Sequence, residues 1–244
     1  MGEYESIYYR ADVYDSFYVA RGKDYRAESH LVLQECEELI SEPESLLDVG
    51  CGTGRHLLEF SKVVHHVEGV DVEPRMLAVA SDQLEGVPLH EGDIRSFRLA
   101  RSFDIVVCMF STVGYLPQQA DLERAIANCA DHLSPGGVLV VEPWWSPSTF
   151  LPGHVAAETV SDSGRKISRS SHTVRKGDYS EMTVHYLVAN SQSGIEHFSD
   201  THLMSLFSTE QYVSAFKSAG LHCSVRPTAL GSRSPGLLIG KASS

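Results

Sequence analysis

Residues 45–56 of the chain read SLLDVGCGTGRH, and this stretch decides the fold. The mainly apolar residues 46–49 predict a buried strand, and the apolar residues after position 56 predict the start of a helix. Between them, alternate glycines at Gly50, Gly52 and Gly54 predict a turn that lets polar groups of a ligand approach the backbone. The spacing differs from the Gly-x-Gly-x-x-Gly that holds the pyrophosphate of a dinucleotide, so it disfavours a nicotinamide enzyme.

Composition limits the class of protein. The 244 residues, 42% hydrophobic and 21% charged, suit one large α/β domain with or without an insertion. A net charge of −12 argues against a nucleic-acid partner, and no apolar run approaches the roughly 20 residues of a membrane span. The N-terminus is acidic and polar, unlike a secretory signal, and the five cysteines lack paired spacing. We therefore expect a cytoplasmic protein with free thiols and no membrane partner.

Strands and helices alternate between residues 46 and 142. Runs rich in valine, leucine and isoleucine are typical of strands covered on both faces, so the sheet is predicted to be parallel. We expect a turn at Ser134–Gly137 before the fifth strand, and a capping box at Ser208–Gln211 that opens the last helix. The expected strands are 46–49, 67–71, 88–93, 103–109 and 137–142, with helices at 73–83 and 122–132 and a final strand pair at 221–225 and 236–240.

Two flanking segments complete the predicted organisation. Residues 1–45 carry many tyrosines and predict two helices, which form a lid or simply pack against the sheet. Three runs between residues 165 and 207 alternate with a period of two and predict an inserted antiparallel meander. The prediction is a helical lid over 1–45, a core over 46–150 and 208–244, and an inserted sheet over 151–207. One face of that sheet needs a cover, which a partner subunit can supply.

Asp71 ends the second predicted strand, 17 residues after Gly54. A carboxylate there can accept hydrogen bonds from both ribose hydroxyls of a nucleoside. With Asp48 directly before it, the glycine turn resembles motif I of the class I S-adenosylmethionine (SAM)-dependent methyltransferases. This resemblance implies a Rossmann-like, seven-stranded, mostly parallel sheet and SAM as the cofactor.

The resemblance also implies the cofactor contacts. Asp93 is expected to bind the adenine amino group, the Ile94 backbone to support the ring, and the carbonyl of Met109 to hold the methionine amino group. Met76 lies against the adenine or, equally well, in the core. The remaining implied cofactor residues are Asp48, Gly50, Gly52, Gly54, Asp71, Val72, Tyr14 and Tyr25.

Several longer runs resemble one family, the TDP-3-aminosugar N,N-dimethyltransferases that complete desosamine and mycaminose for macrolide antibiotics. These runs are 13–15, 22–25, 108–116, 140–145 and 196–203. The resemblance implies a TDP-linked amino sugar that is methylated once and then twice, and a homodimer. Two alternatives are a methyltransferase that acts on another small molecule, at oxygen or another amine, and a SAM-binding protein without catalysis.

Methyl transfer to nitrogen requires a neutral amine held in line with the methyl group, and positioning supplies much of the acceleration. Tyr8, Tyr115 and Glu142 are the predicted catalytic residues, because each can accept or relay the proton of the amine. His185 is a further candidate at the substrate. Glu142 has an equally good interpretation as a structural carboxylate. Trp145 is expected to form a wall of the sugar pocket.

A basic cluster on the first meander strand predicts a site for the diphosphate of the substrate, although charge also protects edge strands from aggregation. Arg169, Ser171 and Arg175 share one face of this strand and are the predicted contacts. In the family pattern an arginine directly precedes Gly-Leu-Phe near the C-terminus, where this chain has proline; we expect Arg233 to reach the phosphate instead. His197 and His202 fall on opposite strand faces, so no metal is predicted.

Overall fold

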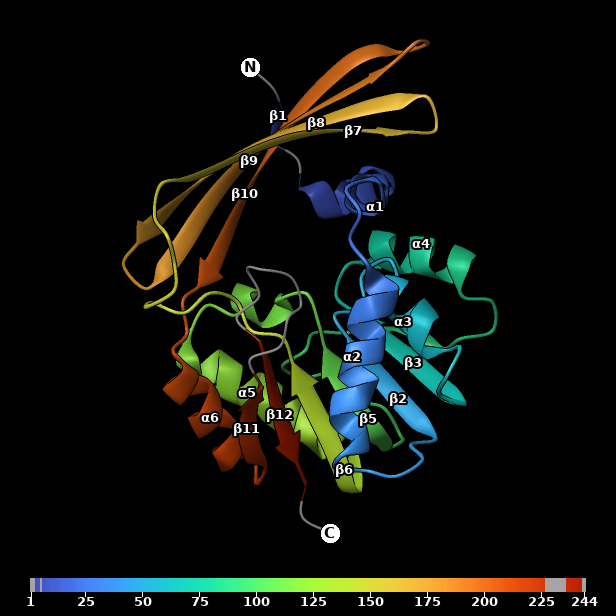
Figure 1. Cartoon of the computed structure of the whole chain (residues 1–244), viewed down its shortest axis with the longest axis vertical. Coiled ribbons are helices and arrows are strands. Elements are labelled where there is room, and N and C mark those ends of the chain that lie inside the picture. The colour runs from blue at the N-terminus through green and yellow to red at the C-terminus, as the bar shows by residue number, and fades with distance from the viewer. Residues whose placement is uncertain (1–2, 5, 227–235, 243–244) are drawn as a thin grey trace.

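The computed structural model describes residues 3–4, 6–226 and 236–242 of the chain. Two sheets organise these residues, one of seven strands and one of five. Figure 1 shows the second sheet above the first, with a helix from the N-terminal segment between them.

The seven-stranded sheet has the order β11-β12-β6-β5-β2-β3-β4. All neighbouring strands are parallel except β12, which runs antiparallel to β6 and to β11. The strand order reverses between β2 and β5, and open α/β sheets bind ligands at such a point. The strands are β2 (Ser45–Val49), β3 (His66–Asp71), β4 (Leu89–Glu91), β5 (Phe103–Cys108), β6 (Leu133–Val141), β11 (His222–Arg226) and β12 (Leu237–Lys241).

Helices cover both faces of this sheet, which confirms the predicted class. On one face α2 (Tyr25–Glu37), α3 (Arg55–Phe60) and α4 (Pro74–Gln83) pack on alternate strand residues such as Leu46. On the other face α5 (Gln119–Asp131) and α6 (Thr209–Ser218) pack on Leu47 and the other strand side chains that point to that face. Successive side chains of a strand point to opposite faces, and β2 is fully buried because helices cover both of them.

The expected turn at Ser134–Gly137 is wrong, because these residues lie within strand β6. Phe103 of β5 pairs with Leu133, but Ile105 already pairs with Val138, so the register shifts in between. A bulge of this kind absorbs the extra residues, and Gly136 adopts a φ of 76° within it. The Pro-Gly-Gly sequence therefore marks a bulge rather than the end of a loop.

The second sheet has the order β1-β10-β9-β8-β7. Its strands are β1 (Glu3–Tyr4), β7 (His154–Asp162), β8 (Arg165–Lys176), β9 (Tyr179–Asn190) and β10 (Gly194–Ser205). Strands β7 to β10 form an antiparallel meander, as predicted, and β1 joins β10 in parallel. The sequence patterns reveal three of these strands but miss β7, whose largely exposed residues lack apolar alternation.

The N-terminal segment covers the inner face of this second sheet. Short helix η1 (Ile7–Arg10) and helix α1 (Ala11–Ala20) place Val13 and Phe17 against Ile167 and Tyr186. Helix α1 therefore packs on the second sheet, whereas α2 packs on the core (Figure 1). On the opposite, outer face four apolar side chains remain exposed, namely Val155, Leu187, Ile195 and Leu203.

Candidate active site

The glycine turn joins β2 to α3 at the carboxyl edge of the core sheet. Gly50, Gly52 and Gly54 all have positive φ, between 55° and 78°, which side chains disfavour. A Cβ on Gly50 would lie 2.6 Å from Thr112, and one on Gly54 would lie 2.6 Å from Leu84. Only glycine therefore allows the turn to pass so close to its neighbours.

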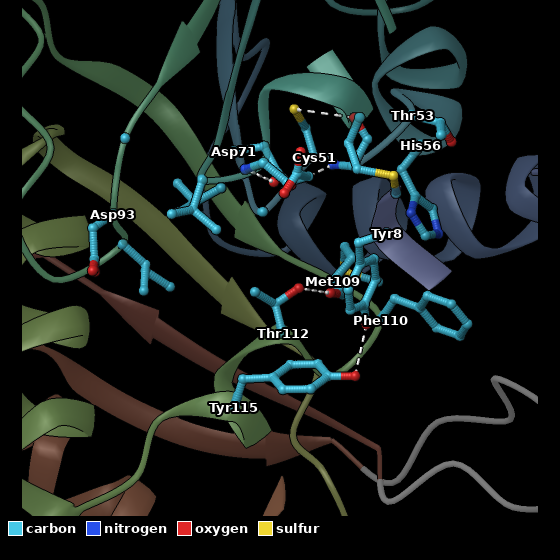
Figure 2. A pocket seen from close by; sticks show the side chains of 18 of the residues that line it. Tyr8, Cys51, Thr53, His56, Asp71, Asp93, Met109, Phe110, Thr112 and Tyr115 are labelled. Atoms are coloured by element: carbon cyan, nitrogen blue, oxygen red, sulfur yellow. Dashed lines mark hydrogen bonds between the residues drawn. The ribbon is translucent and has the colours of Figure 1, made fainter. Parts of the chain in front are cut away.

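A cavity of about 570 Å³ opens beside this turn. Figure 2 shows its lining, in which the hydroxyls of Tyr8 and Tyr115 point toward each other and Asp71 and Asp93 lie apart from them. Two predicted cofactor residues, Asp48 and Gly54, are not among the lining residues. Those that do line the cavity are Tyr14, Tyr25, Gly50, Gly52, Asp71, Val72, Met76, Asp93, Ile94 and Met109.

Backbone amides hold the Asp71 carboxylate in this cavity. Oδ2 accepts the Gly52 N–H at 2.7 Å, and Oδ1 accepts the Glu73 N–H at 2.9 Å. Burial raises the pKa of Asp71, whereas the amide hydrogen bonds oppose that rise. Each carboxylate oxygen retains acceptor capacity. The fixed carboxylate can therefore accept from two neighbouring hydroxyls of a ribose.

Asp93 and Arg95 form a pair that the sequence reasoning missed. The Arg95 Nε lies 2.9 Å from Oδ1 of Asp93, and its Nη2 donates to Oδ2. The guanidinium lowers the pKa of Asp93, so the carboxylate stays charged and acts as an acceptor. Ile94 lies between them in sequence and supplies apolar surface to the same cavity. The arrangement suits an aromatic ring that carries an amino group.

Asp48 lies beneath the turn and is only 1% exposed. Neither carboxylate oxygen has a hydrogen-bond partner among the residues that the structure describes. Burial, reinforced by the charge of Asp71, raises the pKa of Asp48 to about 8. A buried carboxylate without a partner is costly. Asp48 lies under the turn without lining the cavity, and a positive charge brought to the turn would favour its ionised form.

The loop after β5 has an unusual backbone. Phe110 and Ser111 have φ values of 54° and 60°, which non-glycine residues seldom adopt. The Phe110 N–H donates to Oε2 of Glu142 at 2.7 Å, and the Ser111 hydroxyl donates to the Pro143 carbonyl at 2.9 Å. Such strain persists only where the surroundings hold it, and it is frequent at functional sites.

Glu142 lies at the wall of a second cavity of about 650 Å³, between the core and the second sheet. Its side chain is buried, and burial raises the pKa of Glu142 to about 7. Trp145 and Arg169 line the same cavity, with Trp144 beside them. The carboxyl is thus able to exchange a proton near neutral pH.

Four aromatic residues line both cavities and so mark their junction: Tyr8, Tyr14, Phe110 and Tyr115. The hydroxyls of Tyr8 and Tyr115 lie 2.6 Å apart, as Figure 2 shows. Tyr115 also reaches Nδ1 of His202 at 2.8 Å. His202 is not among the predicted site residues, although alternation from the exposed His197 places its side chain on the inner face.

Arg169 is the buried cation of the second cavity. Two other cations there are paired, Arg21 with Glu158 at 2.9 Å and Lys23 with Glu28 at 2.6 Å. Within the described part of the chain no carboxylate pairs with Arg169, which is 9% exposed and donates to the Ser171 hydroxyl at 3.1 Å. A desolvated guanidinium of this kind is suited to an anionic ligand.

Two predicted substrate residues, Arg175 and His185, lie away from the cavities. Arg175 is exposed at the end of β8 and donates to the carbonyls of Gly177 and Pro147. His185 is on the outer face, where its ring stacks on His197, because side chains alternate along β9. Neither residue is among those that line the two cavities. Arg233 falls outside the described residues.

Comparison with known proteins places the chain in a family. A family model described as a methyltransferase domain matches residues 46–137. The dTDP-3-amino-3,4,6-trideoxy-alpha-D-glucopyranose N,N-dimethyltransferase of Streptomyces venezuelae is 49% identical, over 86% of this chain and 89% of that protein. The dTDP-3-amino-3,6-dideoxy-alpha-D-glucopyranose N,N-dimethyltransferase of Streptomyces fradiae is 43% identical, over 89% and 85%.

Comparison with solved structures leads to the same family. Streptomyces venezuelae DesVI has a TM-score of 0.92 and 46% identity, over 96% of this chain and 98% of that one. SAM-bound CalS10, an amino pentose methyltransferase from Micromonospora echinaspora, has a TM-score of 0.87 and 37% identity, over 100% and 99%. Fold and cofactor cavity therefore define a class I SAM-dependent methyltransferase. Within that class the chain belongs to the TDP-aminosugar N,N-dimethyltransferase family, as the sequence resemblance indicated.

Proposed function

We propose that this enzyme transfers methyl groups, one and then a second, to the amino group of a TDP-linked deoxy-aminosugar. We further propose a 3-amino-3,6-dideoxy or 3-amino-3,4,6-trideoxy hexose, as in desosamine or mycaminose formation. The names of the two relatives with 49% and 43% identity support a 3-amino sugar, although another relative, 41% identical, is named for a 4-amino sugar. The observation that carries the proposal is the buried Arg169, which pairs with no carboxylate among the described residues and lies in a cavity that adjoins the cofactor cavity.

The cofactor cavity has a residue for each part of SAM. Asp71 would accept from the ribose hydroxyls, and Asp93 with Ile94 would receive the adenine. Asp48 and the Met109 backbone would face the amino group of the methionine moiety. When bound, SAM supplies an electrophilic methyl group on a sulfonium.

The residues at the junction of the cavities would position the acceptor. Tyr8 and Tyr115 present hydroxyls there, and Phe110, with its strained backbone, lines both cavities beside them. Holding the amine in line removes much of the entropic barrier, so positioning is the main contribution of the protein. Glu142 fixes the Phe110 amide and is able to hold a proton at its carboxyl near neutral pH.

The second cavity would hold the rest of the substrate. Arg169, with Ser171 beside it, would bind the diphosphate, and Trp145 would pack against the sugar. A volume of about 650 Å³ leaves room for an amine that already carries one methyl group.

A competition experiment tests this proposal. The enzyme, SAM and equal amounts of a TDP-3-amino sugar and the same amino sugar without TDP are incubated, and the products are identified by mass spectrometry. We expect methylation of the TDP-linked sugar alone. Equal methylation of the free sugar would contradict a site built around the diphosphate.

The outer face of the second sheet supports a homodimer. Val155, Leu187, Ile195 and Leu203 are between 46% and 74% exposed there, and apolar side chains gathered on an exposed face are typical of an interaction surface. Light scattering after gel filtration tests the dimer, and Leu187→Glu should then yield a monomer.

Among the described residues no helix is long and apolar enough to cross a membrane. The five free cysteines support a cytoplasmic enzyme.

A further inference from the structure

A chain of hydrogen-bonding groups leads away from the junction of the two cavities. Tyr8 Oη lies 2.6 Å from Tyr115 Oη, and Tyr115 Oη lies 2.8 Å from His202 Nδ1. His202 Nε2 then lies 3.5 Å from Oδ2 of Asp200. We call these four residues the relay chain. They come from three separate segments, η1, η2 (Thr112–Tyr115) and β10, so the fold brings them together.

The surroundings fix the direction of these hydrogen bonds. The Asp200 carboxylate accepts the N–H groups of Ile7 at 2.8 Å and of Thr201 at 2.7 Å, so it acts as an acceptor. The negative charge of Asp200, 3.5 Å from Nε2, favours the tautomer of His202 that carries its proton on Nε2 and leaves the Nδ1 lone pair for the Tyr115 hydroxyl. Tyr115 is thereby left to accept the hydroxyl proton of Tyr8.

The charges around His202 favour a neutral ring in the resting enzyme. The titratable and charged groups that face it are Asp200, Arg169, Tyr8 and Tyr115. Burial lowers the pKa of His202, and Arg169 acts in the same direction, whereas Asp200 opposes them. The ring is therefore a vacant acceptor at neutral pH, and Asp200 is placed to stabilise the imidazolium once a proton arrives.

We propose that His202 is the terminal proton acceptor of this methyltransferase, reached from the substrate amine through Tyr8 and Tyr115. This inference rests on the proposed function, because methylation leaves an ammonium that must lose a proton before a second methyl group can be added. In the step, the ammonium N–H bond breaks and Tyr8 Oη takes that proton. The Tyr8 hydroxyl proton moves to Tyr115, and the Tyr115 hydroxyl proton moves to His202 Nδ1.

Both tyrosines meet the requirements of this step. Burial raises the pKa of Tyr8 and of Tyr115, so both hydroxyls stay protonated and pass a proton on without becoming stable anions. Asp200 has a further, positioning role. Its carboxylate binds the Ile7 amide at the start of η1 and so sets where Tyr8 stands. The acceptor and the first member of the relay chain thus depend on one carboxylate.

The test compares His202→Gln and Tyr115→Phe with His222→Gln, an exposed histidine on β11 that lines neither cavity. Rates of the first and second methyl transfer are measured from about pH 6 to about pH 9. We expect the second transfer to slow about 100-fold near neutral pH in both relay variants and to recover as alkaline solvent deprotonates the amine. Affinity for SAM should match the wild type in His202→Gln, because His202 does not line the cofactor cavity, and His222→Gln should behave as wild type throughout.

Nitrogen-15 NMR of the histidine rings gives a second readout that is independent of turnover. In the wild type, His202 should be the Nε2–H tautomer at neutral pH, and Tyr115→Phe should change its titration. A wild-type enzyme that methylates no amino sugar would refute the proposed function itself. Methylation by the wild type together with unchanged rates in both variants, or losses that do not vary with pH, would overturn the relay alone.

Discussion

The carboxylate of Glu142 accepts the backbone N–H of Phe110 at 2.7 Å and so ties the end of β6 to the loop after β5. That loop supplies residues to both cavities and has a backbone conformation that Phe110 would not adopt unaided. One buried hydrogen bond therefore holds the surface on which cofactor and acceptor are expected to meet.

Glu142→Gln should change how stability depends on pH. Burial raises the pKa of Glu142 from its usual 4.5 to about 7, so between these values the folded protein binds more protons than the unfolded chain. Stability of the wild type therefore falls as pH rises through this window. The amide that replaces the carboxyl stays neutral and still offers an acceptor to the Phe110 N–H, so the variant should be about 1 to 3 kcal/mol more stable than wild type above pH 7.

Thermal melts of the wild type and Glu142→Gln at a series of pH values check this expectation. Glu85→Gln, at an exposed position, serves as the control and should follow the wild type. Parallel Tm curves for wild type and Glu142→Gln would show that the carboxyl is not held protonated by burial.

Asp71→Asn should weaken the binding of SAM. The amide keeps one acceptor oxygen but cannot accept from two ribose hydroxyls while both backbone amides remain bound. Hydrogen bonds to a charged acceptor contribute about 1.5 to 3 kcal/mol, so we expect affinity to fall about 10- to 100-fold. Isothermal titration with SAM measures this loss. Asp82→Asn, on the exposed side of α4, should bind as wild type, and equal affinities in the two variants would refute the ribose assignment.

Arg169→Met should separate ligand binding from folding. Loss of the guanidinium removes the charge for the diphosphate, so we expect affinity for TDP to fall at least about 10-fold. Tm should stay level or rise, because a buried charge without a carboxylate partner costs free energy in the folded state. Lys166→Met, on the exposed face of the same strand, should leave TDP affinity unchanged. A lower Tm with normal TDP affinity would assign Arg169 a structural role instead.

Gly54→Ala should destabilise the protein more than Gly86→Ala. Both glycines have positive φ, 78° and 76°, so both substitutions add backbone strain. At Gly54 the new Cβ would also lie 2.6 Å from Leu84 and 3.1 Å from Ala80, whereas at Gly86 nothing lies within 4 Å. We expect Gly54→Ala to cost about 1 to 3 kcal/mol beyond the control, measured by urea unfolding. Equal losses of stability in the two variants would mean that α4 shifts to accommodate the new Cβ at no cost in free energy.

Much of the fold was predictable because its signals are local. Continuous apolar runs predict the strands of the core sheet, and the glycine turn with Asp71 predicts a ligand site at an edge where the structure has a cavity. The alternation of Met182, Val184 and Tyr186 predicted strand β9 and the face that it buries. These patterns show which side chains are buried, and the burial of one face stabilises each strand or helix.

The remaining features depend on contacts between segments far apart in sequence. Strand β7 carries almost no apolar pattern and forms by pairing with β8. The partnership of His202 with Tyr115 spans 87 residues, and that of Asp200 with the Ile7 amide spans 193. No local rule pairs these residues. For His185 the strand period predicts the outer face, where the structure places it.

A time course of methylation tests the central claim most directly. The enzyme is incubated with SAM and a TDP-3-amino sugar, and intact products are followed by mass spectrometry. We predict an early product heavier by one methyl group that is replaced by one heavier by two, with both methyl groups on nitrogen. A sugar that gains no methyl group, or gains it on oxygen, would contradict the assignment of this protein as an aminosugar N,N-dimethyltransferase.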